Sequence, residues 1–158
     1  MTMKSLLAAI SLAAAISQPA MAQGPVPFRG TYESLESQGG GTFPVFLQVL
    51  RGSGEATHLG SFTVEAQWYV NVITGTGVGT FTLTAANGAT LAGTGTGTSV
   101  IVDGLAYIAE TCVITGGTGR FAGATGAFVT ARVLTLTAHP ETDIAESSAS
   151  FQGTIKLR

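Results

Sequence analysis

The sequence predicts an all-β protein whose strands form a closed antiparallel barrel of about eight strands. After residue 22, apolar and polar residues alternate with a period of two, and no stretch has the 3.6-residue apolar period of an amphipathic helix. Turn signals rich in glycine separate these runs at short intervals, which is typical of an antiparallel meander. Closure removes the two edges that an open sheet of this length would expose. A β-sandwich is the alternative.

The first 22 residues are expected to be removed before the protein folds. Lys4 precedes an apolar run over residues 6–16, and Ala-Met-Ala at 20–22 is a cleavage sequence of the A-x-A type. These features are typical of a secretory signal peptide, and the apolar run is too short for a membrane span. We therefore expect a single domain over residues 23–158, secreted or periplasmic, without a membrane span.

The composition argues against several classes of partner. The chain has nine acidic and seven basic residues, with no basic patch, so a nucleic-acid partner is not expected. Cys112 is the only cysteine and cannot form an intrachain disulfide, so it is expected to be buried in a strand. His58 and His139 are the only histidines and lie at no metal-ligand spacing, so neither a metal nor a cofactor is expected.

Nine segments are expected to form strands. The first three, at 28–36, 43–50 and 55–59, are separated by the turn signals Gly-Gly-Gly at 39–41 and Gly-Ser-Gly at 52–54. The other segments are 61–73, 77–85, 89–102, 105–115, 126–138 and 145–157.

Alternation is clearest in segments 61–73 and 145–157. In the first, Trp68 shares one face with Phe62 and Val64, which predicts a half-buried strand with the indole inside. In the last, Phe151 lies on the apolar face. These two aromatic residues are therefore expected in the barrel interior.

A hairpin follows the Trp68 strand. A three-residue loop at 86–88 pairs Phe81 with Gly93 and lets the aromatic ring cover the glycine, whereas a two-residue Asn-Gly turn would mix the two faces. Gly95 and Gly97 follow on the same side as Gly93. Such glycines either allow sharp coiling of the sheet or leave room inside it.

Two charged residues lie on largely apolar faces of their strands. Glu110 shares a face with Ile108, and Arg132 shares one with Leu134. If both faces point inward, the two side chains could meet on neighbouring strands, where a buried pair must be mutually satisfied. Alternation along this strand is ambiguous, and in the other interpretation the Tyr107 face is the inner one and Glu110 is exposed.

The segment 116–126 connects two strands and is rich in glycine. We expect it to form a structural corner in which Phe121 plugs one end of the barrel and Arg120 binds local carbonyl groups or stays in solvent. A carboxylate-binding role for Arg120 is the alternative. The glycines of this corner are Gly116, Gly117, Gly119, Gly123 and Gly126.

Segments 56–60, 84–88 and 114–126 resemble those of a widespread group of secreted bacterial proteins of unknown function. The third segment also resembles a turn in the allene oxide cyclases and plant dirigent proteins. That resemblance implies an eight-stranded antiparallel barrel with a central cavity. No cyclase or dirigent catalytic residue matches a position in this chain, so the resemblance implies no activity.

Three functions are compatible with this sequence. The barrel could bind a small apolar or amphipathic ligand, act as a cofactor-free cyclase or isomerase, or serve as a structural or interaction protein with a filled core. In the first two, Trp68, Phe81 and Phe151 would line the cavity, and Glu110 or Arg132 would orient the ligand. The sequence assigns no catalytic residue and leaves a homo-oligomer open.

Overall fold

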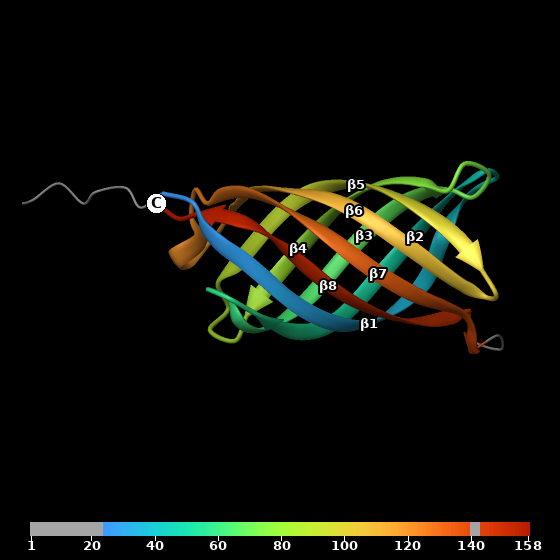
Figure 1. Cartoon of the computed structure of the whole chain (residues 1–158), viewed down its shortest axis with the longest axis horizontal. Coiled ribbons are helices and arrows are strands. Elements are labelled where there is room, and N and C mark those ends of the chain that lie inside the picture. The colour runs from blue at the N-terminus through green and yellow to red at the C-terminus, as the bar shows by residue number, and fades with distance from the viewer. Residues whose placement is uncertain (1–23, 140–142) are drawn as a thin grey trace, which may run out of the picture.

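The computed structural model describes residues 24–139 and 143–158, which form a closed barrel of eight antiparallel strands (Figure 1). The signal peptide expected at residues 1–22 lies outside the described residues. The strands are β1 (Val26–Thr42), β2 (Val45–Ala56), β3 (Gly60–Asn71), β4 (Thr76–Ala85), β5 (Thr90–Val102), β6 (Leu105–Gly117), β7 (Thr125–His139) and β8 (Ile144–Lys156).

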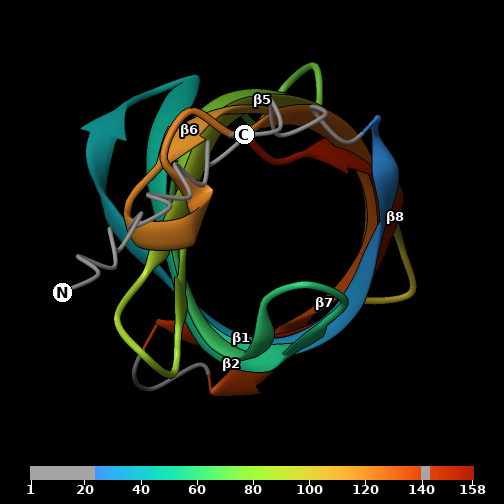
Figure 2. The same cartoon turned by 90° about the vertical axis from the view of Figure 1, so that its left-hand side faces the viewer.

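Every strand pairs with its neighbours in chain order, and β8 closes on β1. Gly30 of β1, for example, lies opposite Ala56 of β2 on one side and Phe151 of β8 on the other. Figure 2 shows the strands closing into a ring when the barrel is viewed end on. The barrel prediction is confirmed, and the sandwich alternative is wrong.

The second predicted strand and the start of the third form one continuous strand, β2, so the turn predicted at 52–54 is wrong. Residues 57–59, predicted as strand, lie in the β2–β3 turn. Gly52 and Gly54 lie within the ladder, opposite Ser34 and Tyr32 of β1. A Cβ at either glycine would lie 2.0 Å from a carbonyl oxygen of β1. These glycines therefore permit a close approach of two strands and do not form a turn.

The turn predicted at 39–41 is also displaced. Strand β1 continues to Thr42, with a shift of register between Gln38 and Gly40. The φ angles of Gly40 and Gly41 are +120° and +135°, so the glycines serve an irregularity within the strand. The reversal itself falls at residues 43–44.

The predicted register of the β4–β5 hairpin is confirmed. Phe81 pairs with Gly93, and Gly88 has a φ of +84° in the three-residue loop. A Cβ at Gly93 would lie 2.5 Å from Cζ of Phe81, and one at Gly95 would lie 2.6 Å from Cη2 of Trp68. The bare glycines of β5 thus contact aromatic rings of β4 and β3.

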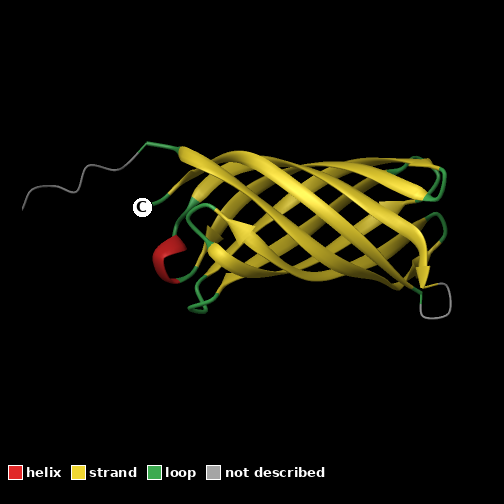
Figure 3. Ribbon diagram, turned by 60° about the horizontal axis from the view of Figure 1, so that its bottom comes forward, coloured by secondary structure: helices red, strands yellow, loops and turns green. Residues whose placement is uncertain are grey.

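The core fills one half of the barrel. We call this half the closed end; it carries the N-terminus of β1 and the β2–β3, β4–β5 and β6–β7 connections. Phe28, Phe128 and Phe151 pack there with ring centroids 5.1–5.5 Å apart. The corner between β6 and β7 contains the short helix η1 (Gly119–Phe121), which lies at this end of the barrel (Figure 3). Phe121 is fully buried in the same core.

Arg120 was expected to bind carbonyl groups within its own segment, but it reaches a different turn. Arg120 donates a hydrogen bond to the backbone carbonyl of His58, in the β2–β3 turn, and its guanidinium lies 4.9 Å from the centroid of the Phe121 ring. Gly119 and Gly123 have φ angles of +57° and +70°. The hydrogen bond of Arg120 therefore connects this corner to the β2–β3 turn at the closed end.

In the described part of the chain, no helix is long and apolar enough to cross a membrane.

Candidate functional site

A cavity of about 520 Å³ occupies the other half of the barrel. We call this half the open end: it carries the β1–β2, β3–β4, β5–β6 and β7–β8 hairpins. Pairing of Gly77 with Gly97 leaves part of its wall without side chains. Its apolar lining includes Trp68, Val70, Ile101, Ile108, Leu134 and Ile144.

Three charged side chains meet at the inner part of this cavity. Arg132 of β7 lies between Glu36 of β1 and Glu110 of β6, and all three residues are at most 5% exposed. Nη2 of Arg132 donates to Oε1 of Glu110 at 2.6 Å, and Nη1 donates to Oε1 of Glu36. We call these residues the Glu–Arg–Glu cluster. They are the only buried charged residues in the part of the chain that the structure describes.

One donor of the cluster has no protein partner. Nε of Arg132 is buried and makes no hydrogen bond to any of the described residues. A buried donor left without an acceptor lowers the stability of the fold.

Burial dominates the electrostatics of the cluster. It raises the pKa of Glu110 to about 7 in spite of the contact with Arg132, whose charge is shared with Glu36. Burial also lowers the pKa of Arg132. Glu110 therefore exchanges its proton near neutral pH, which is uncommon for a carboxyl group.

Tyr32 and Cys112 face the same cluster. Burial raises the pKa of the Tyr32 hydroxyl, and the charge of Glu110 raises it further, whereas Arg132 lowers it. Burial raises the pKa of the Cys112 thiol to about 12, again with a contribution from Glu110. Both groups thus stay neutral at physiological pH, and Cys112 is buried as predicted.

The structure places three of the five predicted pocket residues at the cavity. Trp68, Glu110 and Arg132 line it. Phe81 and Phe151 do not: both pack against Phe128 in the aromatic core towards the closed end, so their prediction as lining residues is corrected. Both rings pack against bare glycine backbone and against neighbouring rings, in the half of the interior that the core fills.

The sequence interpretation that left Glu110 exposed is wrong. Glu110 is 4% exposed, whereas Tyr107 of the same strand is 49% exposed and faces outward. Glu36 was not predicted as a site residue from the sequence. Its signal was present, because period-two alternation along β1 places Glu36 on the same face as Phe28 and Tyr32.

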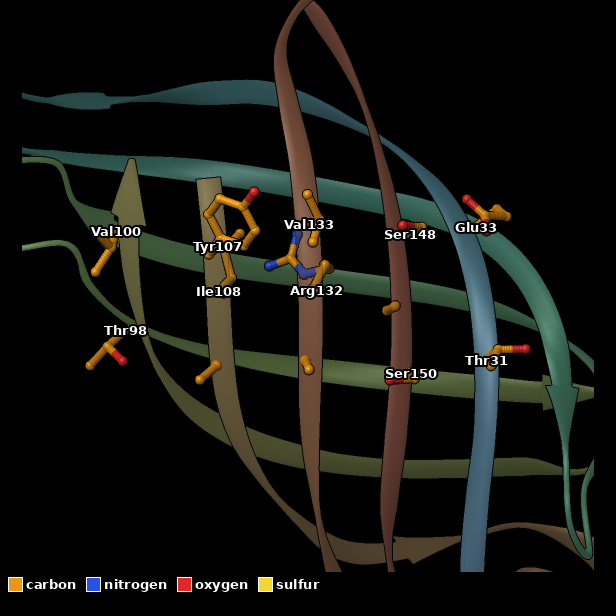
Figure 4. Close-up of a pocket in the computed structure, with 13 residues that line it drawn as sticks. Thr31, Glu33, Thr98, Val100, Tyr107, Ile108, Arg132, Val133, Ser148 and Ser150 are labelled. Atoms are coloured by element: carbon orange, nitrogen blue, oxygen red, sulfur yellow. The ribbon is translucent and has the colours of Figure 1, made fainter. Parts of the chain in front are cut away.

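A shallower depression of about 740 Å³ lies on the outer wall, across β5, β6, β7, β8 and β1 (Figure 4). Tyr107, Val133 and Ser148 stand on three adjacent strands there. Its lining consists largely of side chains that face solvent, and Arg132 lies at its boundary with the interior. The interior cavity is the better candidate, because it combines enclosure with the buried charges.

Among the side chains that the structure describes, no group of three His, Cys, Asp or Glu is placed to hold a metal ion. Comparison with models of known families finds no match, and comparison with curated proteins finds no significant relative. The resemblance to allene oxide cyclases and dirigent proteins therefore stays a prediction. The evidence for the barrel fold is the strand pairing in the structure.

Proposed function

We propose that this protein is a binding module that holds a small apolar or amphipathic molecule in the open half of its barrel. The observation that carries the proposal is the division of the interior: one half is filled by aromatic side chains, and the other holds a cavity of about 520 Å³. That volume lies within the usual range of small-molecule sites. The signal peptide expected from the sequence would deliver such a module to the periplasm or the cell exterior.

The lining suggests how a ligand would lie. Apolar side chains such as Ile108 and Leu134 would contact its hydrocarbon body, and the Glu–Arg–Glu cluster would receive its polar end. The three residues of the cluster supply the charged groups at that end. A few convergent polar groups in an apolar cavity are the usual means of orienting a ligand.

A cofactor-free cyclase or isomerase is the second candidate. It is favoured by Glu110, whose pKa of about 7 suits a general acid or base, and which lies beside the cationic Arg132. Ligand binding that survives Glu110→Gln would support plain binding, whereas turnover lost in that variant would support the enzyme. A filled core, the third alternative, does not account for the cavity.

Isothermal titration with the neutral probe 4-phenylbutan-1-ol tests the binding proposal. We expect saturable binding that Gly77→Leu weakens by about tenfold or more, because the new side chain would occupy the cavity. Gly77 tolerates a side chain, since a Cβ there would lie no closer than 3.5 Å to any neighbour. Thr96→Leu, on the outer face of β5, is the matched control and should bind as the wild type does. Equal binding of the probe by the wild type and by Gly77→Leu would contradict the proposal.

A further inference from the structure

The charged residues that line the cavity are unbalanced in sign. Glu36, Glu110 and Asp143 line it, against Arg132 as the one described cation. Within the Glu–Arg–Glu cluster itself, one guanidinium serves two carboxylates. When both glutamates are ionised, the cluster keeps one uncompensated negative charge in an apolar surrounding, where such a charge is costly.

In both glutamates, one carboxylate oxygen does not bind Arg132. Arg132 uses Oε1 of Glu36 and Oε1 of Glu110, and no described residue makes a hydrogen bond to Oε2 of either. Neither Oε2 is sealed from solvent, because in the described part of the chain Nε of Arg132 is the only fully buried side-chain nitrogen or oxygen without a hydrogen-bond partner. Two acceptors with negative character are thus available to a ligand.

From this arrangement we infer that the ligand is an apolar molecule carrying a protonated amine. An ammonium group brings three donors and a positive charge, so it can bind the spare oxygens of Glu36 and Glu110 while it neutralises the excess charge of the cluster. Trp68, in the same wall, adds an aromatic surface that is compatible with a cation. This inference rests on the proposed binding function and specifies its ligand class.

The same arrangement disfavours a carboxylate ligand. An anion at the inner end of the cavity would meet Arg132 only together with the two glutamates that already bind it. At the outer end it would meet Asp143. In a poorly solvated site, a ligand carboxylate and these acidic side chains would repel each other strongly.

Three probes with one carbon skeleton test the inference: 4-phenylbutylamine, 4-phenylbutan-1-ol and 4-phenylbutyrate, each titrated calorimetrically into the full protein at pH 7. We expect the amine to bind about tenfold more tightly than the alcohol, and the carboxylate to bind most weakly. The amine should also release protons from Glu110, seen as a difference in heat between phosphate and Tris buffers. Protons should not be released when the alcohol binds.

Glu110→Gln and Glu36→Gln should each bring the ratio of amine to alcohol affinity down towards one. Circular dichroism establishes that each variant is folded. Glu33→Gln is the matched control, because it removes the same charge from the exposed outer face of β1 and should leave the ratio unchanged.

The outcomes separate the two proposals. Equal binding of amine and alcohol, tightest binding of the carboxylate, or an equal effect of Glu33→Gln would overturn the amine inference and leave the binding function standing. Failure of all three probes to bind would contradict the binding function itself.

Discussion

Nη2 of Arg132 lies 2.6 Å from Oε1 of Glu110, between two adjacent strands and inside the barrel. The two residues are 22 positions apart, and Glu36, which completes the cluster, is 96 positions from Arg132. A buried ion pair rarely adds net stability compared with apolar packing, but removal of one partner leaves a buried charge unpaired. The cluster is therefore a sensitive point of the fold as well as the polar end of the cavity.

Arg132→Met is expected to lower the free energy of unfolding by about 3–5 kcal/mol at pH 8, because two buried carboxylates lose their cation. The loss should shrink at pH 5, where protonation relieves Glu110. Urea denaturation at the two pH values measures both effects. Arg51→Met is the control: it breaks a pair with Glu65 in which both side chains are 71% exposed, and it should cost less than about 1 kcal/mol. Equal losses in the two variants would contradict a structural role for the cluster.

Glu110 is expected to make stability fall as the pH rises from about 4.5 to about 7. Burial raises the pKa of its carboxyl from 4.5 to about 7, so in this window the folded protein holds a proton that the unfolded chain releases. The contribution is complete below pH 4.5 and is lost as the pH passes 7, with a total on the order of 3 kcal/mol. The measurement is urea denaturation of wild type and Glu110→Gln across this range. Parallel stability profiles would show that Glu110 titrates normally.

Two glycines on β4 should respond oppositely to alanine. A Cβ at Gly79 would lie 2.4 Å from the carbonyl oxygen of Gln67 and 2.7 Å from the Trp68 ring, so Gly79→Ala should destabilise by about 1–3 kcal/mol. A Cβ at Gly77 has room, so Gly77→Ala should be neutral or stabilising by up to about 1 kcal/mol. Thermal and urea unfolding provide the comparison. Similar effects at both positions would mean that the glycines serve only backbone flexibility.

Phe121→Ala should open the closed end. The side chain is fully buried in the core, and its removal is expected to cost about 3–5 kcal/mol. Arg120→Ala removes the exposed neighbour and its hydrogen bond to the His58 carbonyl, at about 1 kcal/mol or less. Urea denaturation of the two variants tests whether Phe121 is the plug. A larger loss for Arg120 than for Phe121 would reverse these roles.

The sequence alone predicted the fold class and the hairpin register around Phe81 and Gly93. These features depend on local signals: alternation within one strand, the conformational demands of a short loop, and a glycine that leaves room for a ring. Strand continuity was harder to predict. The Gly-Ser-Gly sequence at 52–54 is typical of a turn, but Gly52 and Gly54 pair with Ser34 and Tyr32 in the β1–β2 ladder. No local feature of the sequence indicates that pairing.

The charged cluster was decided by tertiary structure. Alternation shows that Glu110 and Ile108 share a face, but not which face of the strand becomes the interior. The sequence favoured the Tyr107 face as the inner one, and the structure buries the Glu110 face. Closure of β8 on β1 resolves this, because it brings Glu36 to the side of Arg132 across 96 residues of chain. Period-two patterning is a property of each strand alone, whereas the meeting of three buried charges is a property of the closed ring.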